Sequence, residues 1–201
     1  AVSCAIFQPD SASSSAPAAM TPRHASTTFA ASCRDAEGFL TGASQAAFPD
    51  QLVINISGDG GMQMCAQELS TASINKLPVV TVILNNMYLG MVRQWQELFY
   101  DKNYAMTCLE RNAGCETWCN KPGAECPTYV PDFVKLAEAH DCHGERITQR
   151  AEIEPALKRA FEIARTQKRP TVLEFMVARE ENVYPMVPAG ARLDQMIDSL
   201  I

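Results

Sequence analysis

The chain has 201 residues, of which 47% are hydrophobic and 20% charged, and its formal net charge is −6. An acidic chain without clusters of lysine and arginine is not typical of a nucleic-acid-binding protein. It contains no apolar run near the roughly 18 residues that a membrane-spanning helix requires. The composition therefore predicts a soluble, cytoplasmic protein that binds neither nucleic acid nor a membrane.

The first 47 residues differ in composition from the rest of the chain. They are rich in Ala, Ser, Thr and Pro, as in residues 11–19 and 21–28, and they show no helical or strand periodicity. We interpret residues 1–47 as an irregular, low-complexity segment that precedes a domain at residues 48–201. Such a composition is typical of a flexible extension.

Beyond that segment, strand-like and helix-like stretches alternate along the chain. Apolar runs of strand length lie at residues 51–57, 78–84 and 170–177. A helical spacing of apolar residues extends from Met62 through Lys76. Strands that alternate with helices predict an α/β fold, with a parallel sheet flanked by helices.

Two further helices are expected in the second half of the chain. Pro131 suits the first turn of one, which would end near His140 and His143. One face of the other is predicted to point into the core, and its residues are Ile153, Ala156, Leu157, Ala160, Phe161 and Ala164.

Two polar motifs follow the first two predicted strands. Gly58-Asp59-Gly60-Gly61 ends the first strand, and a helix that begins there would expose free N–H groups, which bind anions. Asn85-Asn86 ends the second strand, and 24 residues separate Gly60 from Asn85. Because parallel strands end at one edge of a sheet, we expect both motifs to meet there. Each motif alone is more often an ordinary turn or strand end.

The oxygen atoms of these motifs are of one chemical kind. The Asp59 carboxylate, the Asn86 amide oxygen and a backbone carbonyl just beyond it are hard donors, which Mg²⁺ prefers when phosphates and water complete its octahedron. The two motifs together predict a site for a diphosphate and a metal ion.

The spacing of these motifs resembles the fingerprint of enzymes that use thiamine diphosphate (ThDP). Three longer segments, at residues 85–100, 131–139 and 181–190, resemble the large subunit of acetolactate synthase, also called acetohydroxyacid synthase. The resemblance runs collinearly from about Phe48 to Ile201. It therefore implies the C-terminal ThDP-binding domain of that subunit.

The resemblance assigns a role to each site residue. Asp59, Asn86 and the main-chain carbonyl of Tyr88 would hold Mg²⁺ against the diphosphate. The cofactor-binding residues would be Gly58, Asp59, Gly60, Gly61, Met62, Asn86, Tyr88, Gly90 and Met91. Met91 would lie against the thiazolium ring, and Trp95 would line the substrate channel. Without the resemblance, Trp95 would be interpreted as a residue on one face of an ordinary amphipathic helix.

The implied reaction condenses pyruvate with a second 2-oxo acid, pyruvate or 2-oxobutyrate, with loss of CO₂, in branched-chain amino-acid biosynthesis. The family's catalytic glutamate belongs to a pyrimidine-binding domain, and a middle domain binds FAD. We recognise neither domain in this chain and expect them in trans or from a homo-oligomer partner, with a separate regulatory small subunit. Two alternatives stay open: another ThDP-dependent decarboxylase, oxidase or carboligase, and a noncatalytic fragment that keeps the cofactor cradle.

Two features depart from the family's pattern. The small-residue lead-in that the family would place before Phe48 is missing, and a reading-frame shift is a hypothesis that competes with a natural extension. Four cysteines occupy an unusually long loop, at Cys108, Cys115, Cys119 and Cys126. They lack the paired C-x2-C spacing of specific zinc sites, so metal binding, disulfides and unpaired thiols all remain open.

Overall fold

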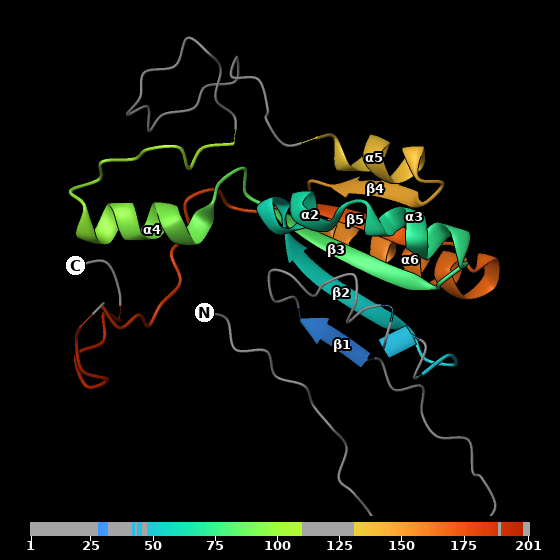
Figure 1. Ribbon diagram of the computed structural model, residues 1–201, viewed down its shortest axis with the longest axis horizontal. Coiled ribbons are helices and arrows are strands. Elements are labelled where there is room, and N and C mark those ends of the chain that lie inside the picture. The colour runs from blue at the N-terminus through green and yellow to red at the C-terminus, as the bar shows by residue number, and fades with distance from the viewer. Residues whose placement is uncertain are drawn as a thin grey trace, which may run out of the picture. The chain divides into compact units, whose positions relative to one another are not determined.

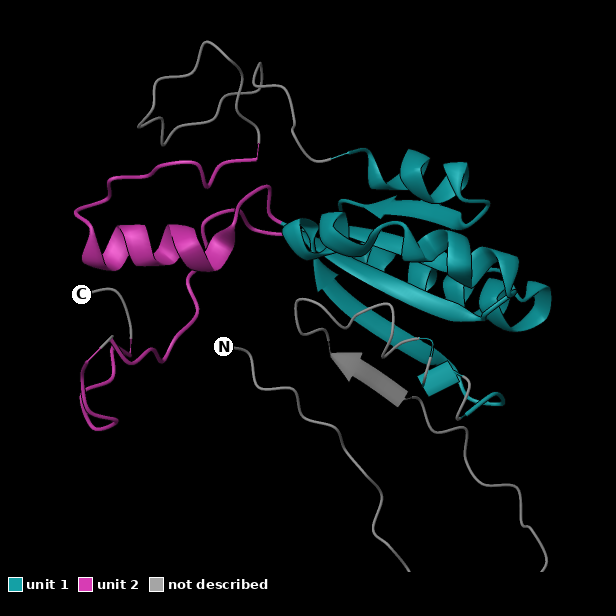
Figure 2. Ribbon diagram, viewed as in Figure 1, with its two compact units in different colours: residues 1–85, 131–176 teal, residues 86–130, 177–201 magenta. Residues whose placement is uncertain are grey.

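The computed structural model describes residues 28–31, 42, 44–45, 48–109, 131–188 and 190–198. The chain divides into two compact units, each built from two separate stretches of sequence (Figure 2). Unit 1 comprises residues 1–85 and 131–176, and unit 2 comprises residues 86–130 and 177–201. Unit 1 contains the sheet, and unit 2 contains the helix α4, Gly90–Phe99.

The sheet of unit 1 has five strands among the described residues (Figure 1). They are β1 (Thr28–Ala31), β2 (Val53–Gly58), β3 (Val79–Asn85), β4 (His143–Ile147) and β5 (Thr171–Met176). Their order across the sheet is β1-β2-β3-β5-β4, and every neighbouring pair is parallel. The predicted fold class, a parallel α/β sheet flanked by helices, is confirmed.

Helices pack on both faces of this sheet. On one side, α6 (Ile153–Gln167) packs its fully buried Ala156, Ala160 and Ala164 against the strands. These small side chains let the helix approach the sheet closely, and branched residues of the strands fill the remaining space. The other helices of unit 1 are α2 (Asp59–Cys65), α3 (Glu68–Ile74) and α5 (Phe133–Ala139). A short 3-10 helix, η1 (Arg150–Glu152), leads into α6.

The predicted elements need several corrections. The helix expected from Met62 through Lys76 is two helices, α2 and α3, and Lys76 has a left-handed φ of 51°. Pro131 precedes α5, which Asp132 caps by accepting hydrogen bonds from Val134 N and Lys135 N. Ile153 was expected in the core but is 38% exposed, because it is the first residue of α6.

Two strands were not predicted. His140 caps the end of α5 as expected, but His143 begins β4 rather than ending a helix. The expectation that residues 1–47 contain no strand is wrong at β1, which pairs in parallel with β2. Both are edge strands, and an edge strand does not need the continuous apolar sequence of a strand buried on both sides.

Candidate cofactor and metal site

The first part of the candidate site is the turn after β2, in unit 1. Gly58 ends β2 and precedes α2 in an extended conformation, with φ −86° and ψ 167°. Asp59 begins α2 and is only 3% exposed. Its Oδ1 accepts a hydrogen bond of 2.7 Å from Gly60 N. The turn therefore orients the carboxylate, and the buried side chain of Met62 anchors the same helix.

The strands β2 and β3 end at the same edge of the sheet. Gly58 lies opposite Leu84 in the parallel register, one residue before β3 ends at Asn85. This placement of the two strand ends was predicted and is confirmed. Asn85 is fully buried, and its Nδ2 donates a hydrogen bond of 2.7 Å to Oε1 of Glu174 on β5.

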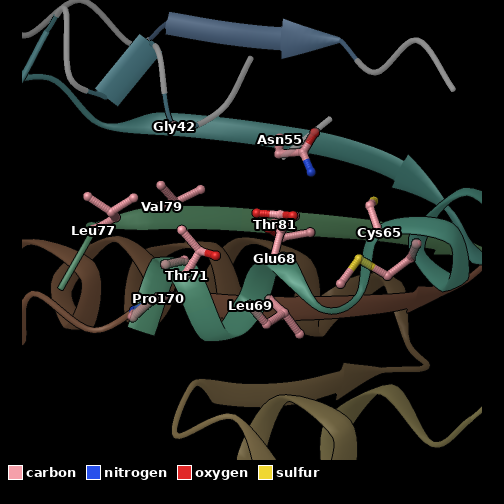
Figure 3. A pocket seen from close by; sticks show the side chains of 12 residues that line it. Gly42, Asn55, Cys65, Glu68, Leu69, Thr71, Leu77, Val79, Thr81 and Pro170 are labelled. Atoms are coloured by element: carbon pink, nitrogen blue, oxygen red, sulfur yellow. The ribbon is translucent and has the colours of Figure 1, made fainter. Parts of the chain in front are cut away.

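A small cavity lies between the strands β2 and β3 and the helices α2 and α3 (Figure 3). Its volume is about 70 Å³, and Asn55, Thr81 and Glu68 line it from β2, β3 and α3. Among the described residues, no hydrogen-bond partner reaches Oδ1 of Asn55. Asn55 lies in the middle of β2, and Met62 and Cys65 of α2 also line the cavity, which therefore borders the helix that follows the turn at Gly58.

The second part of the candidate site is a tight turn in unit 2. Asn86 Oδ1 accepts a hydrogen bond of 3.1 Å from Tyr88 N, and Met87 between them has a left-handed φ of 59°. A Cβ atom on Gly90 would lie 3.0 Å from Asn86 Nδ2. Glycine at position 90 therefore leaves the room that the Asn86 carboxamide occupies.

The side chain of Tyr88 contacts two arginines of unit 2. The guanidinium carbon of Arg93 lies 5.2 Å from the ring centre, and that of Arg179 lies 5.0 Å from it. Arg93 also lies 4.9 Å from the ring of Tyr104 and forms an ion pair of 3.0 Å with Glu97. Burial, with a smaller contribution from Cys108, raises the pKa of the Tyr88 phenol. Cation–π contacts on a desolvated ring are worth up to about 2 kcal/mol, so they fix this residue firmly.

The helix α4 presents two different sides. Met91 is 37% exposed and Trp95 48% exposed, and they lie one turn apart on an apolar side of the helix. Gln94 is only 2% exposed. Its side-chain amide donates to Val183 O (2.8 Å) and accepts from Val183 N (2.9 Å), which ties the C-terminal segment to the helix.

The predicted site residues therefore belong to two groups. Gly58, Asp59, Gly60, Gly61 and Met62 lie together at the start of α2 in unit 1. Asn86, Tyr88, Gly90, Met91 and Trp95 lie together at the start of α4 in unit 2.

Sequence reasoning missed the residues that support these groups. Glu174 carried a signal, because it is a lone charge within the apolar run at residues 170–177. The partner of Gln94 carried none, because Val183 is distant in sequence, whereas Arg93 carried a local signal, since Glu97 lies one helical turn further along α4.

The hypotheses about the cysteine cluster fall mostly outside the described residues. Only Cys108 of the four is described. Its backbone pairs with that of Tyr88 in an isolated antiparallel β-bridge. Across the described ranges, no three His, Cys, Asp or Glu side chains form a group that would hold a metal ion. In that same part of the chain, none of the helices has the length and apolar composition needed to cross a bilayer.

Open parallel α/β sheets bind ligands at the carboxyl ends of their strands, and here that edge carries the acidic turn after β2 and the asparagine that ends β3. The profile of the family described as "Thiamine pyrophosphate enzyme, C-terminal TPP binding domain" matches residues 17–175. The chain belongs to this family. The match begins well before Phe48, where the resemblance noticed in the sequence starts.

Individual relatives agree with this assignment. The chain is 42% identical over 148 residues to the acetolactate synthase large subunit of Corynebacterium glutamicum, covering 74% of this chain and 21% of that protein. It is 37% identical over 157 residues to the acetolactate synthase isozyme 2 large subunit of Escherichia coli K12, covering 78% of this chain and 25% of that one. The predicted resemblance to acetolactate synthase large subunits is confirmed. The chain spans about a fifth to a quarter of the length of these relatives.

Solved structures of similar proteins agree on the fold. A thiamine diphosphate-dependent 4-hydroxybenzoylformate decarboxylase of Rhodococcus jostii RHA1 superposes with a TM-score of 0.50 at 27% identity, over 72% of this chain and 24% of that one. A benzoylformate decarboxylase of Polynucleobacter necessarius gives a TM-score of 0.53 at 20% identity, over 73% of this chain and 23% of that one.

Proposed function

We propose that this chain is the part of an acetolactate synthase large subunit that binds ThDP and Mg²⁺. The reaction would join pyruvate to a second 2-oxo acid, pyruvate or 2-oxobutyrate, with loss of CO₂. The observation that carries this proposal is the 42% identity over 148 residues to an acetolactate synthase large subunit. That identity exceeds the 27% shared with a decarboxylase of the same cofactor class, so the carboligase is favoured over a decarboxylase.

The metal would be held by Asp59, Asn86 and the main-chain carbonyl of Tyr88. All three supply hard oxygen atoms, and a carboxylate neutralises part of the charge of the ion. The turn at Gly60 N orients the Asp59 carboxylate. The Asn86 amide oxygen accepts one hydrogen bond, from Tyr88 N, and a carbonyl oxygen has a second lone pair for a ligand. The donor set therefore fits a magnesium ion with a diphosphate.

The remaining proposed residues would shape the cofactor pocket and the substrate side. Gly58, Gly60, Gly61 and Met62 would surround the diphosphate, and Gly90 and Met91 would approach the cofactor from α4. Bound ThDP supplies the carbanion chemistry, and the protein positions it. The exposed Met91 and Trp95 would cover the reacting atoms and exclude water. The apolar side of α4 supports that role, because exclusion of water strengthens electrostatic interactions in a site.

The whole enzyme would require further parts. We propose that a pyrimidine-binding domain with the catalytic glutamate and an FAD-binding domain act together with this chain. A regulatory small subunit is a further proposed partner, since the relatives are named large subunits.

The first test is a calorimetric titration of the 201-residue chain with ThDP, with Mg²⁺ present and again with a chelator. Saturable binding that requires Mg²⁺ is the expected result. Absence of Mg²⁺-dependent binding, both to the chain alone and after addition of the missing domains of a relative, would refute the proposed cofactor site. The reaction itself is tested by adding the missing domains of a relative and measuring acetolactate formed from pyruvate.

A further inference from the structure

Glu174 is an unusual residue for its place in the fold. It lies inside β5, whose first five residues are buried, and it is only 1% exposed. Burial of a carboxylate carries a large desolvation penalty, and an apolar residue at such a position is often equally stable or more stable. Stability of the sheet alone therefore does not explain a glutamate here.

The contacts of Glu174 divide between its two oxygen atoms. Oε2 accepts a hydrogen bond of 2.7 Å from Nε of Arg146, on the neighbouring strand β4. Oε1 accepts a hydrogen bond of 2.7 Å from Nδ2 of Asn85, at the end of β3. Arg146 is 41% exposed and also reaches Asp132, the residue that caps α5. Arg146 thus balances the negative charge of Glu174 at Oε2, and Oε1 accepts the hydrogen bond from Asn85.

Asn85 joins the sheet to the turn that contains Asn86. It is the last residue of β3 and is completely buried. The residue that follows it is Asn86, whose side chain forms the turn with Tyr88 N. A fixed Asn85 side chain therefore fixes the end of the strand from which the Asn86 turn departs.

We infer that Glu174 is a positioning residue for the proposed metal site: through its hydrogen bond to Asn85, it holds the last residue of β3, which directly precedes the Asn86 turn. The inference rests on the proposed function as far as the metal is concerned. The effect on the Asn86 turn itself is independent of any metal. Loss of a direct hydrogen-bond partner of a metal ligand typically lowers metal affinity by about 10- to 100-fold, and Glu174 acts one residue further away, through Asn85, so we expect an effect at the lower end of that range.

The test uses Glu174→Gln, Asn85→Asp and the double variant that combines them. Glu174→Gln removes the buried charge, and Asn85→Asp places two carboxylates side by side. In the double variant the glutamine donates to the new aspartate, and its carbonyl oxygen still accepts from Arg146. The double variant therefore restores both the hydrogen bond and the total charge.

The matched control is Glu145→Gln. Glu145 lies on β4 and forms an ion pair with Arg159 on α6. The substitution removes the carboxylate partner of Arg159 but leaves the hydrogen bond between Asn85 and Glu174 in place.

Two measurements separate positioning from a general loss of stability. The first is hydrogen exchange at the Tyr88 amide, which donates to Asn86 and needs no cofactor. The second is the Mg²⁺ dependence of ThDP binding. We expect about tenfold faster exchange at Tyr88 and about tenfold weaker Mg²⁺ binding in each single variant, with recovery in the double variant and no change in the control.

The outcomes are distinguishable. Unchanged exchange at Tyr88 in Glu174→Gln would overturn the inference, as would equal changes in the control. Unchanged Mg²⁺ affinity alongside faster exchange would overturn the part that concerns the metal. If the wild-type chain binds no Mg²⁺ or ThDP but exchange at Tyr88 follows the double-variant pattern, the proposed function fails while the coupling of Glu174 to the Asn86 turn stands.

Discussion

Substitution of Gly90 by alanine should separate metal binding from stability. The new Cβ would lie 3.0 Å from Asn86 Nδ2, so the carboxamide must move by a few tenths of an ångström. Rotation of a side chain by about 30° costs roughly 0.5–1.5 kcal/mol. In the middle of a helix alanine is favoured over glycine by about 0.5–1 kcal/mol, and at Gly90, the first residue of α4, the gain is smaller. The two effects oppose each other, so the free energy of unfolding should change by less than about 1 kcal/mol.

Metal binding should respond differently. Mg²⁺ requires near-ideal octahedral geometry, and the displaced group is a proposed ligand. We expect Mg²⁺ affinity in the presence of ThDP to fall about tenfold, which corresponds to about 1.4 kcal/mol. Calorimetric titration measures the affinity, and thermal unfolding followed by circular dichroism measures stability.

Gly144→Ala provides the reciprocal control. Its Cβ would lie 2.8 Å from Val134 O and 3.0 Å from Val134 Cα, which are backbone atoms of α5 and have no rotamer to adopt. Overpacking of this kind costs about 1–3 kcal/mol of stability, and Mg²⁺ affinity of the folded protein should not change. Our reasoning about Asn86 would be refuted if Gly90→Ala left Mg²⁺ affinity intact, or if both variants lost affinity in proportion to stability.

Three further predictions concern single residues. Asp59→Asn should weaken Mg²⁺-dependent ThDP binding by at least tenfold, because it removes the charge that neutralises the metal, and unchanged calorimetric affinity would contradict the assigned ligand. Trp95→Leu should leave ThDP affinity within about twofold but lower kcat/KM for 2-oxo acids in the complemented enzyme, since its exposed side chain is assigned to the substrate side; a large loss of ThDP affinity would refute that placement. Burial raises the pKa of the Cys142 thiol to about 11 from 9.0, so the folded state keeps its proton between these values while the unfolded state loses it. Stability from this group is therefore complete below pH 9 and declines by up to about 1.4 kcal/mol per pH unit toward pH 11. Denaturant unfolding between pH 9 and pH 11 measures this decline in stability, with Cys142→Ala as reference. An equal decline in the variant would contradict the raised pKa of Cys142 as its cause.

The sequence predicted the central strands better than the edges of the sheet. The apolar runs that became β2, β3 and β5 are buried on both faces over most of their length, so their composition alone distinguishes them. The edge strand β4 has the sequence His-Gly-Glu-Arg-Ile and buries only its last residue completely, so no apolar run marks it. Local sequence could not identify β1 either, because pairing with β2 defines it.

The candidate site shows the same division between local and distant information. The positions of Asp59 and Asn86 were predictable because each follows a strand directly, and parallel strands end at one edge; their role at a metal site stays a prediction. The clamp of Gln94 on Val183 joins residues 89 positions apart, and no local pattern specifies it. Glu174 could have been suspected from its apolar neighbours, but only the fold reveals that Asn85 is its partner.

The strand order also has a consequence for folding during synthesis. Among the described residues, β5 is the last strand in sequence, yet it lies between β3 and β4 in the sheet. During synthesis, β3 therefore exposes an unpaired edge, and β4 has no neighbour, until residues 171–176 have left the ribosome. Unpaired strand edges with apolar faces are prone to aggregation. A nascent chain stalled before Thr171 should be a strong client for chaperones, and one stalled well beyond Met176 should not.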